Sequence, residues 1–257
     1  EVGIAGLLSD LASGRGFGHS LIHAMGMWFA YVALEPYVRR LWPRMLVSWA
    51  RLITGRMRDP LVGRDLVVGM LFGALINALG LGLFALARHF GLTNIPSLAN
   101  PAMFDSMSGI GAESVGLAWS GSVCVLNVLQ SLFVLLMLRL LLRNTAAAVT
   151  VTFLLLTATG LWYLVPAYGW LVALLVAVLG NCTILLVVRF GLLVTVGATF
   201  ATLVLAGVPA SLDFSSWSAG LILLPMLLLA GIACYGAAMS LGGKSILGDP
   251  LDEPVKR

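Results

Sequence analysis

Long apolar stretches, interrupted only by charges, prolines or clusters of Gly, Ser and Asn, constrain this chain more than any other feature. A helix of about 20 mostly apolar residues crosses the roughly 30 Å of hydrocarbon in a bilayer. Hydrophobic residues make up 60% of the chain and charged residues 10%, whereas soluble proteins carry about 25% charged residues. Because so little polar surface could cover a soluble globule, the sequence predicts an integral membrane protein.

The apolar stretches predict an all-α fold, a polytopic bundle of about seven transmembrane helices that forms a single membrane domain over residues 1–257. The predicted spans are Phe17–Leu34, Leu66–Arg88, Gly121–Leu142, Thr145–Val165, Gly169–Val188, Phe190–Gly207 and Ala219–Ser240. The fifth and sixth spans are separated only by Arg189. Taken together they are too long for one crossing, so we divide them at that arginine.

The distribution of basic residues predicts the orientation, because cytoplasmic loops retain arginine and lysine during insertion. If residues 35–65 are cytoplasmic, only Arg15 and Arg88 lie outside. The basic residues inside are then Arg39, Arg40, Arg44, Arg51, Arg56, Arg58, Arg64, Arg139, Arg143, Arg189, Lys244, Lys256 and Arg257. We therefore expect the N-terminus outside, an outer loop over residues 91–118, and a cytoplasmic tail over residues 241–257.

An external N-terminus normally follows a signal peptide, yet residues 1–18 have neither a basic start nor a cleavage site. The first residue is Glu1 rather than Met. We therefore expect this chain to be the membrane part of a longer product.

Residues 41–58 predict one amphipathic helix on the cytoplasmic membrane surface. Its apolar positions are Trp42, Met45, Leu46, Trp49 and Ile53, and arginines follow the opposite face. Basic residues opposite tryptophans suit the anionic headgroups of the inner leaflet; the alternative is docking of a soluble partner. The residues predicted to contact lipid or a partner are Trp42, Arg44, Trp49, Arg51, Arg56, Arg58, Asp59 and Arg64.

The polar residues at mid-depth in the predicted spans are neutral. Transporters and proton pumps usually carry charged groups there, so this interior argues against ion transport. Asn127, Gln130 and Ser131 share one helix face and predict a hydrogen-bonded seam between helices. Gly69 and Gly73 form a G-x-x-x-G step, and with Asn77 they predict close helix packing, within this chain or against a partner.

His19 and His23 are four residues apart, so on a helix their imidazoles project from one face near the outer end of the first span. This geometry could hold a metal, a haem or a magnesium-porphyrin pigment of the chlorophyll type. No third ligand is evident, and histidines hydrogen-bonded to water or lipid headgroups are the alternative. We predict no metal site, no catalytic residue and no required cofactor, and we expect bound lipids.

Two sequence blocks carry a resemblance to a known family. The first comprises Tyr31–Arg40, Trp42–Pro43, Ser48–Trp49, Arg51–Leu52 and Arg58–Asp65; the second comprises Arg189–Leu193, Leu212–Trp217, Tyr235–Gly236 and Ser240–Gly243. From about Trp28 to Leu247 the chain resembles the C-terminal membrane region of acidobacterial serine/threonine protein kinases. The resemblance implies a cytoplasmic kinase domain upstream.

The catalytic motifs of such a kinase are missing from this chain. Lysine occurs only at positions 244 and 256, and neither H-R-D nor D-F-G is present. We therefore expect no enzymatic activity from this polypeptide.

Three functions are compatible with these features. The first is a non-catalytic accessory subunit of a larger complex in the bacterial inner (cytoplasmic) membrane, for example a photosynthetic reaction centre or a respiratory complex. The second is the membrane anchor or sensor domain of a receptor-like kinase, and the third is a transporter or channel for a neutral solute. The expected partners are other integral membrane proteins and anionic lipids at the cytoplasmic face, not nucleic acid.

Overall fold

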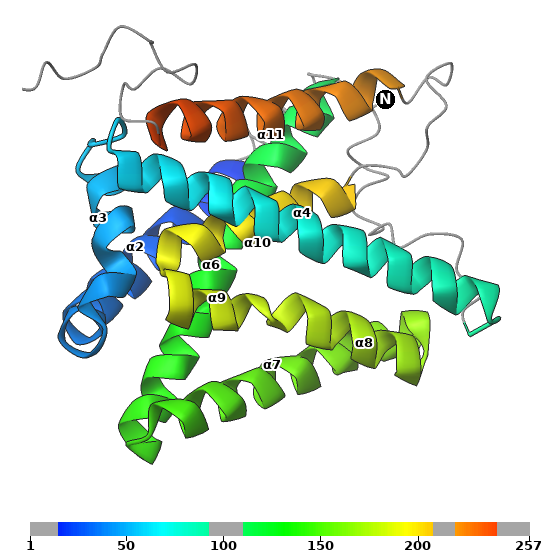
Figure 1. Ribbon diagram of the computed structural model, residues 1–257, viewed down its shortest axis with the longest axis horizontal. Helices are drawn as coiled ribbons and strands as arrows, with labels where there is room; N and C mark the ends of the chain where they lie inside the picture. Colours follow the sequence, from blue (N-terminus) through cyan, green and yellow to red (C-terminus); the bar gives the residue numbers. More distant parts are fainter. Residues whose placement is uncertain (1–14, 93–109, 208–218, 241–257) are drawn as a thin grey trace, which may run out of the picture.

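The structure, a computed structural model, describes residues 15–92, 110–207 and 219–240, and every element within these ranges is a helix (Figure 1). This confirms the all-α prediction for the described part of the chain. The elements are α2 (Arg15–Leu41), the 3-10 helix η1 (Pro43–Leu46), α3 (Val47–Ile53), α4 (Pro60–His89), α6 (Ile110–Leu142), α7 (Thr145–Tyr168), α8 (Trp170–Asn181), α9 (Thr183–Phe190), α10 (Leu192–Gly207) and α11 (Ala219–Ser240).

Five helical segments of the described chain are long and apolar enough to cross a membrane, which makes this a multi-pass membrane protein. They are Pro60–His89, Gly116–Leu142, Thr145–Pro166, Trp170–Phe190 and Leu223–Ser240. The fourth combines α8 and α9, which meet at Cys182.

The sequence predicts seven spans, so two predicted spans are not among these five. The sixth predicted span corresponds to α10, which is apolar and has 16 residues within the described part of the chain. At 1.5 Å per residue it is about 24 Å long, less than the hydrocarbon thickness. The first predicted span lies within α2.

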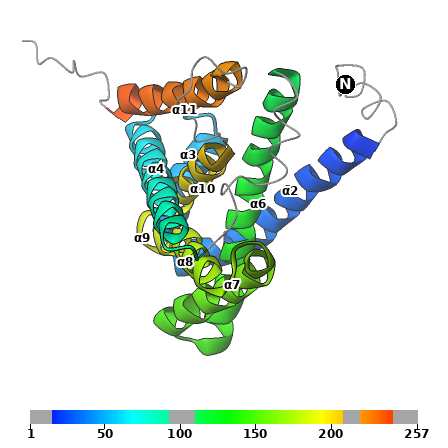
Figure 2. The ribbon, with the colours of Figure 1, turned by 90° about the vertical axis from the view of Figure 1, so that its right-hand side faces the viewer.

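Helix α4 lies between α10 and α11 and packs closely against both. A Cβ atom at Gly69 would lie 2.6 Å from the carbonyl oxygen of Val194 in α10. A Cβ atom at Gly63 would lie 2.6 Å from the carbonyl oxygen of Gly236 in α11. Only glycine allows the backbones to approach this closely. Figure 2 shows α4, α10 and α11 on one side, α6 and α2 on the other, and α7 beside α8.

Neutral polar groups hydrogen-bond between these helices. The hydroxyl of Thr202 in α10 donates to the carbonyl of Gly73 at 3.3 Å, and the side-chain amide of Asn77 donates to the carbonyl of Thr202 at 3.5 Å. The amide of Asn181 in α8 donates to the hydroxyl of Thr157 in α7 at 3.4 Å. The structure thus places Gly69, Gly73 and Asn77 at the contact between α4 and α10.

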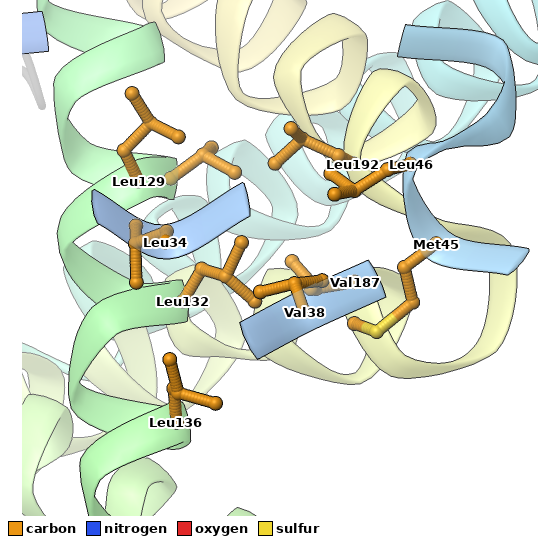
Figure 3. Close-up of a cluster of buried hydrophobic side chains, with 10 residues drawn as sticks. Leu34, Val38, Met45, Leu46, Leu129, Leu132, Leu136, Val187 and Leu192 are labelled. Carbon is orange, nitrogen blue, oxygen red and sulfur yellow. The ribbon is translucent and has the colours of Figure 1, made fainter. Parts of the chain in front are cut away.

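A cluster of buried apolar side chains joins α2, η1, α6, α9 and α10 (Figure 3). Its members are Leu34, Val38, Met45, Leu46, Val128, Leu129, Leu132, Leu136, Val187 and Leu192. Because these residues come from five separate elements, the cluster fixes η1 and α3 to the helices that span the membrane.

The surface helix predicted over residues 41–58 is shorter in the structure, where η1 and α3 follow each other directly and cover residues 43–53. Leu41 ends α2, Pro43 begins the 3-10 helix η1, and α3 follows with seven residues. Proline lacks a backbone N–H and has a fixed φ, which suits the first residue of a helical segment such as η1. Gly55, at φ +78°, follows the end of α3.

The apolar face of this segment also packs differently from the prediction. Met45 and Leu46 are buried in the cluster, and Trp42 and Trp49 are half-buried against it. Met45 and Leu46 therefore contact the protein's own helices rather than lipid, whereas Trp42 and Trp49 keep part of their surface exposed. The arginines Arg44, Arg56 and Arg58 remain exposed.

Candidate functional site

One end of the helix bundle, called here the arginine end, gathers most of the described basic side chains. At this end α2, α6 and α9 finish and α4, α7 and α10 begin, on the left of Figure 1. Its arginines are Arg39, Arg40, Arg44, Arg51, Arg56, Arg58, Arg64, Arg139, Arg143 and Arg189. Arg88 lies at the opposite end of α4. The described part of the bundle therefore has one strongly positive end.

Asp59 fixes the beginning of α4 at the arginine end. One of its carboxylate oxygens accepts a hydrogen bond from the backbone N–H of Leu61 at 2.9 Å, and Pro60 occupies the first helical position. The other oxygen pairs with the guanidinium of Arg51 in α3 at 2.6 Å. The Leu61 N–H and Arg51 hold the pKa of Asp59 below its ordinary value.

The lowered pKa of Asp59 predicts how acid affects this attachment. A carboxylate with a lowered folded-state pKa stabilises the fold above its unfolded-state pKa, and the stabilisation disappears as the pH falls through the folded-state value. Asp59→Asn retains an oxygen for the cap but loses the charge that pairs with Arg51. We expect wild type to melt at a higher temperature than Asp59→Asn at neutral pH, and the difference to vanish under strongly acidic conditions.

Melting curves of both proteins across a pH series in one detergent measure this difference, and other carboxylates cancel because both proteins contain them. A difference that stays constant at every pH would show that the charge of Asp59 makes no contribution.

Asp65, one turn into α4, links this helix to α3. Only 4% of this residue is exposed. Its carboxylate accepts a hydrogen bond from the hydroxyl of Ser48 and two from the guanidinium of Arg64, at 2.9 and 2.8 Å. A buried carboxylate is tolerated only when it is paired and hydrogen-bonded, and Asp65 is both.

A pocket of about 280 Å³, called here the arginine pocket, lies beside Asp65. Three guanidinium-bearing residues line it: Arg44 from η1, Arg64 from α4 and Arg189 from α9. The remaining lining residues are Met45, Val47, Ser48, Leu61, Asp65, Val188, Phe190 and Gly191. The pocket therefore combines a cationic part with an apolar part.

Two of the three pocket arginines, Arg44 and Arg64, are among the predicted contact residues, whereas Arg189, Ser48 and Asp65 are not. Arg189 was identifiable as the sole charge between two apolar stretches. Of the other predicted contact residues, Arg51 and Asp59 pair with each other, while Arg56 and Arg58 lie exposed between α3 and α4. The predicted tryptophans pack into the apolar cluster, and the indole N–H of Trp49 has no hydrogen-bond partner within the described structure.

Apart from the arginine pocket, the described structure has two side-chain amides exposed on a membrane span. They are Asn127 and Gln130 of α6. The predicted hydrogen-bonded seam does not form among the described helices: the hydroxyl of Ser131 donates to the backbone carbonyl of Asn127 in its own helix, at 2.7 Å. No hydrogen bond of either side-chain amide to another described residue is present. Both residues lie on the surface of the described structure.

His19 and His23 belong to α2, and their side chains lie outside the described residues. Elsewhere in the described chain, no three His, Cys, Asp or Glu side chains are close enough to hold a metal ion. No protein-family model, no curated protein and no solved structure matches the chain.

Proposed function

We propose that this chain is a non-catalytic, membrane-embedded subunit of a larger membrane protein complex. The observation that carries the proposal is the outward position of Asn127 and Gln130 in the middle of a membrane span. The span of α6 covers Gly116–Leu142, whose midpoint is residue 129. Asn127 and Gln130 thus lie within about 3 Å of the span centre along the helix axis.

Amide side chains at this depth are costly when they face lipid. An amide without a hydrogen-bond partner in an apolar medium costs about 2–7 kcal/mol. The side chains of Asn and Gln are too short to reach the headgroups from mid-span, whereas longer Lys and Arg side chains near helix ends can do so. A polar group on a neighbouring protein would satisfy both amides, as hydrogen bonds between transmembrane helices do.

The face of α6 that carries Gln130 also exposes large apolar side chains. Phe133, Met137 and Leu141 are 47%, 42% and 77% exposed. The opposite face of α6 is occupied by α2, α7 and α10. A transmembrane helix of another protein would cover this face and bury its apolar residues around the two amides. We call it the α6 amide face.

In this proposal the arginine end faces the cytoplasm of a bacterium and the bundle lies in its inner membrane, in keeping with the tendency of arginine to remain inside. Photosynthetic reaction centres and respiratory complexes are the kinds of assembly proposed to contain it. Neither a pigment nor a haem is required for this role.

The proposal predicts that the α6 amide face holds the complex together. In the double variant Asn127→Leu and Gln130→Leu, the interprotein hydrogen bonds are lost while the span stays apolar. At about 0.6–2 kcal/mol for each such bond, the amount of partner that co-purifies should fall about tenfold or more. The measurement is a native gel of mildly solubilised membranes, with mass spectrometry of every polypeptide in the band.

Thr150→Val with Thr159→Val is the matched control. These residues are also exposed polar side chains of a membrane span, but each hydroxyl donates to a carbonyl of its own helix α7. The control should retain the complex. The proposal would be wrong if wild type migrated as a lone chain, or if the Leu variant retained all of its partners.

A second candidate function is the membrane anchor of a receptor-like kinase. What favours it is the position of residues 31–65, the longest block of the kinase-family resemblance, which ends at the arginine end where a soluble domain would dock. The same mass spectra separate the two candidates, because kinase peptides continuous with Glu1 would indicate an anchor domain.

A further inference from the structure

The arginine pocket is a candidate binding site that plays no part in the proposed assembly with another membrane protein. Its three arginines lie far apart in the sequence, at positions 44, 64 and 189, and the fold brings them to one cavity. At the junction between them, Gly191 packs against the backbone of η1: a Cβ atom there would lie 2.9 Å from the carbonyl oxygen of Met45. One wall of the cavity, where Gly191 meets η1, is therefore closely packed.

The charges of the arginine pocket favour an anion. Asp65 is the acidic residue in its lining, and its carboxylate is already occupied by Ser48 and Arg64. Arg44 and Arg189 form no ion pair with any residue the structure describes. Two guanidinium groups are therefore available, and guanidinium binds phosphate oxygens in a planar, two-point geometry.

The apolar part of the lining distinguishes between anions. Met45, Val47, Leu61, Val188 and Phe190 line the pocket beside the arginines. An inorganic phosphate would gain nothing from these side chains, whereas a phospholipid could place its glycerol and first acyl carbons against them. The pocket also lies where α4 begins and α9 ends, at one end of two helical segments long and apolar enough to span a membrane, and the ends of such spans meet the lipid headgroups.

From this geometry we propose that the arginine pocket binds the phosphate-bearing headgroup of an anionic phospholipid. The volume of about 280 Å³ suits a headgroup rather than an entire lipid. Arg44 and Arg189 bind the phosphate oxygens, Arg64 adds positive charge while it remains paired with Asp65, and the apolar side chains contact the glycerol. The inference needs the chain to be in a membrane but does not need the complex proposed above.

The test is native mass spectrometry of the detergent-purified full chain, titrated with phosphatidylglycerol, phosphatidylcholine or inorganic phosphate. Wild type should bind phosphatidylglycerol more tightly than phosphatidylcholine. In the double variant Arg44→Gln and Arg189→Gln, the dissociation constant for phosphatidylglycerol should rise about tenfold or more, because charge-assisted hydrogen bonds are lost. Both arginines are exposed, so the variant should melt like wild type without added lipid.

Arg56→Gln with Arg58→Gln is the matched control, since it removes the same charge from the arginine end at residues outside the pocket. Its dissociation constant should change less than about threefold, as for surface charges in general. If the double variant at 44 and 189 does not fold, Arg189→Gln alone is compared with Arg56→Gln.

Equal weakening in the pocket and control variants would overturn the proposal, because binding would then depend on surface charge alone. Inorganic phosphate that binds as tightly as phosphatidylglycerol and depends on the same arginines would overturn the assignment to a lipid. The variant Asn127→Leu with Gln130→Leu should still bind phosphatidylglycerol like wild type, because neither residue lines the arginine pocket. That result would hold even if this variant lost the complex.

Discussion

Replacing Gly69 and Gly73 together with alanine should separate α4 from α10 and destabilise the whole bundle. A Cβ atom at Gly69 would lie 2.6 Å from the carbonyl oxygen of Val194, and one at Gly73 would lie 2.6 Å from Cβ of Ala201 and also collide with the carbonyl of Ala198. Overpacking of this kind costs about 1–3 kcal/mol at each site. Thermal unfolding of the purified variant in detergent measures the loss.

The overpacking cost of alanine at Gly69 and Gly73 is partly offset, because alanine has a higher helix propensity than glycine. Alanine in place of glycine inside a helix is intrinsically favourable by about 0.5–1 kcal/mol. Gly82 lies in the same helix, and a Cβ atom there would meet nothing within 4 Å, so Gly82→Ala should be neutral or slightly stabilising. A melting temperature of Gly69→Ala/Gly73→Ala at or above that of Gly82→Ala would contradict the close contact between α4 and α10.

The second large effect is expected at Gly191, where α9 ends and the chain turns into α10. Its backbone has φ +102° and ψ 178°, a conformation open to glycine and strained for any other residue. A residue held there costs about 1–3 kcal/mol. In Gly191→Ala the new methyl group would also lie 2.9 Å from the carbonyl oxygen of Met45, which adds about 1–3 kcal/mol.

Gly169, between α7 and α8, separates these two contributions. It has φ +76° and ψ 165°, but a Cβ atom there meets nothing within 4 Å. Gly169→Ala should therefore be destabilised by the backbone strain alone. We expect Gly191→Ala to melt at a lower temperature than Gly169→Ala, and to weaken binding of phosphatidylglycerol as the arginine pocket opens. Equal melting temperatures would mean that the contact with Met45 contributes nothing.

Much of the fold follows from local sequence. The apolar stretches predict where membrane helices lie, and Arg189 marks the break between the fifth and sixth predicted spans, which the structure places at Gly191 between α9 and α10. Such features are readable because one bilayer imposes the same length and polarity on every span. The short α10 shows the limit: its apolar composition resembles that of a span, but the turn at Gly191 begins it and only 16 of its residues lie within the described chain.

Over residues 41–58, the pattern of apolar side chains does not reveal what the apolar face of the predicted surface helix packs against. The spacing of Trp42, Met45 and Trp49 is compatible with packing on lipid or on protein, since both are apolar. Only the positions of α2, α9 and α10 decide between them, because these helices pack against η1, in which Met45 is buried.

Hydropathy and charge act residue by residue, so they were enough to predict a helical chain embedded in a membrane. Tertiary structure alone decided which polar groups have partners. Asn77 and Asn181 hydrogen-bond to neighbouring helices, whereas Asn127 and Gln130 project outward. Tertiary structure also brought Arg44, Arg64 and Arg189 to one cavity. Both outcomes depend on contacts between residues distant in sequence, which helix packing sets and no local pattern encodes.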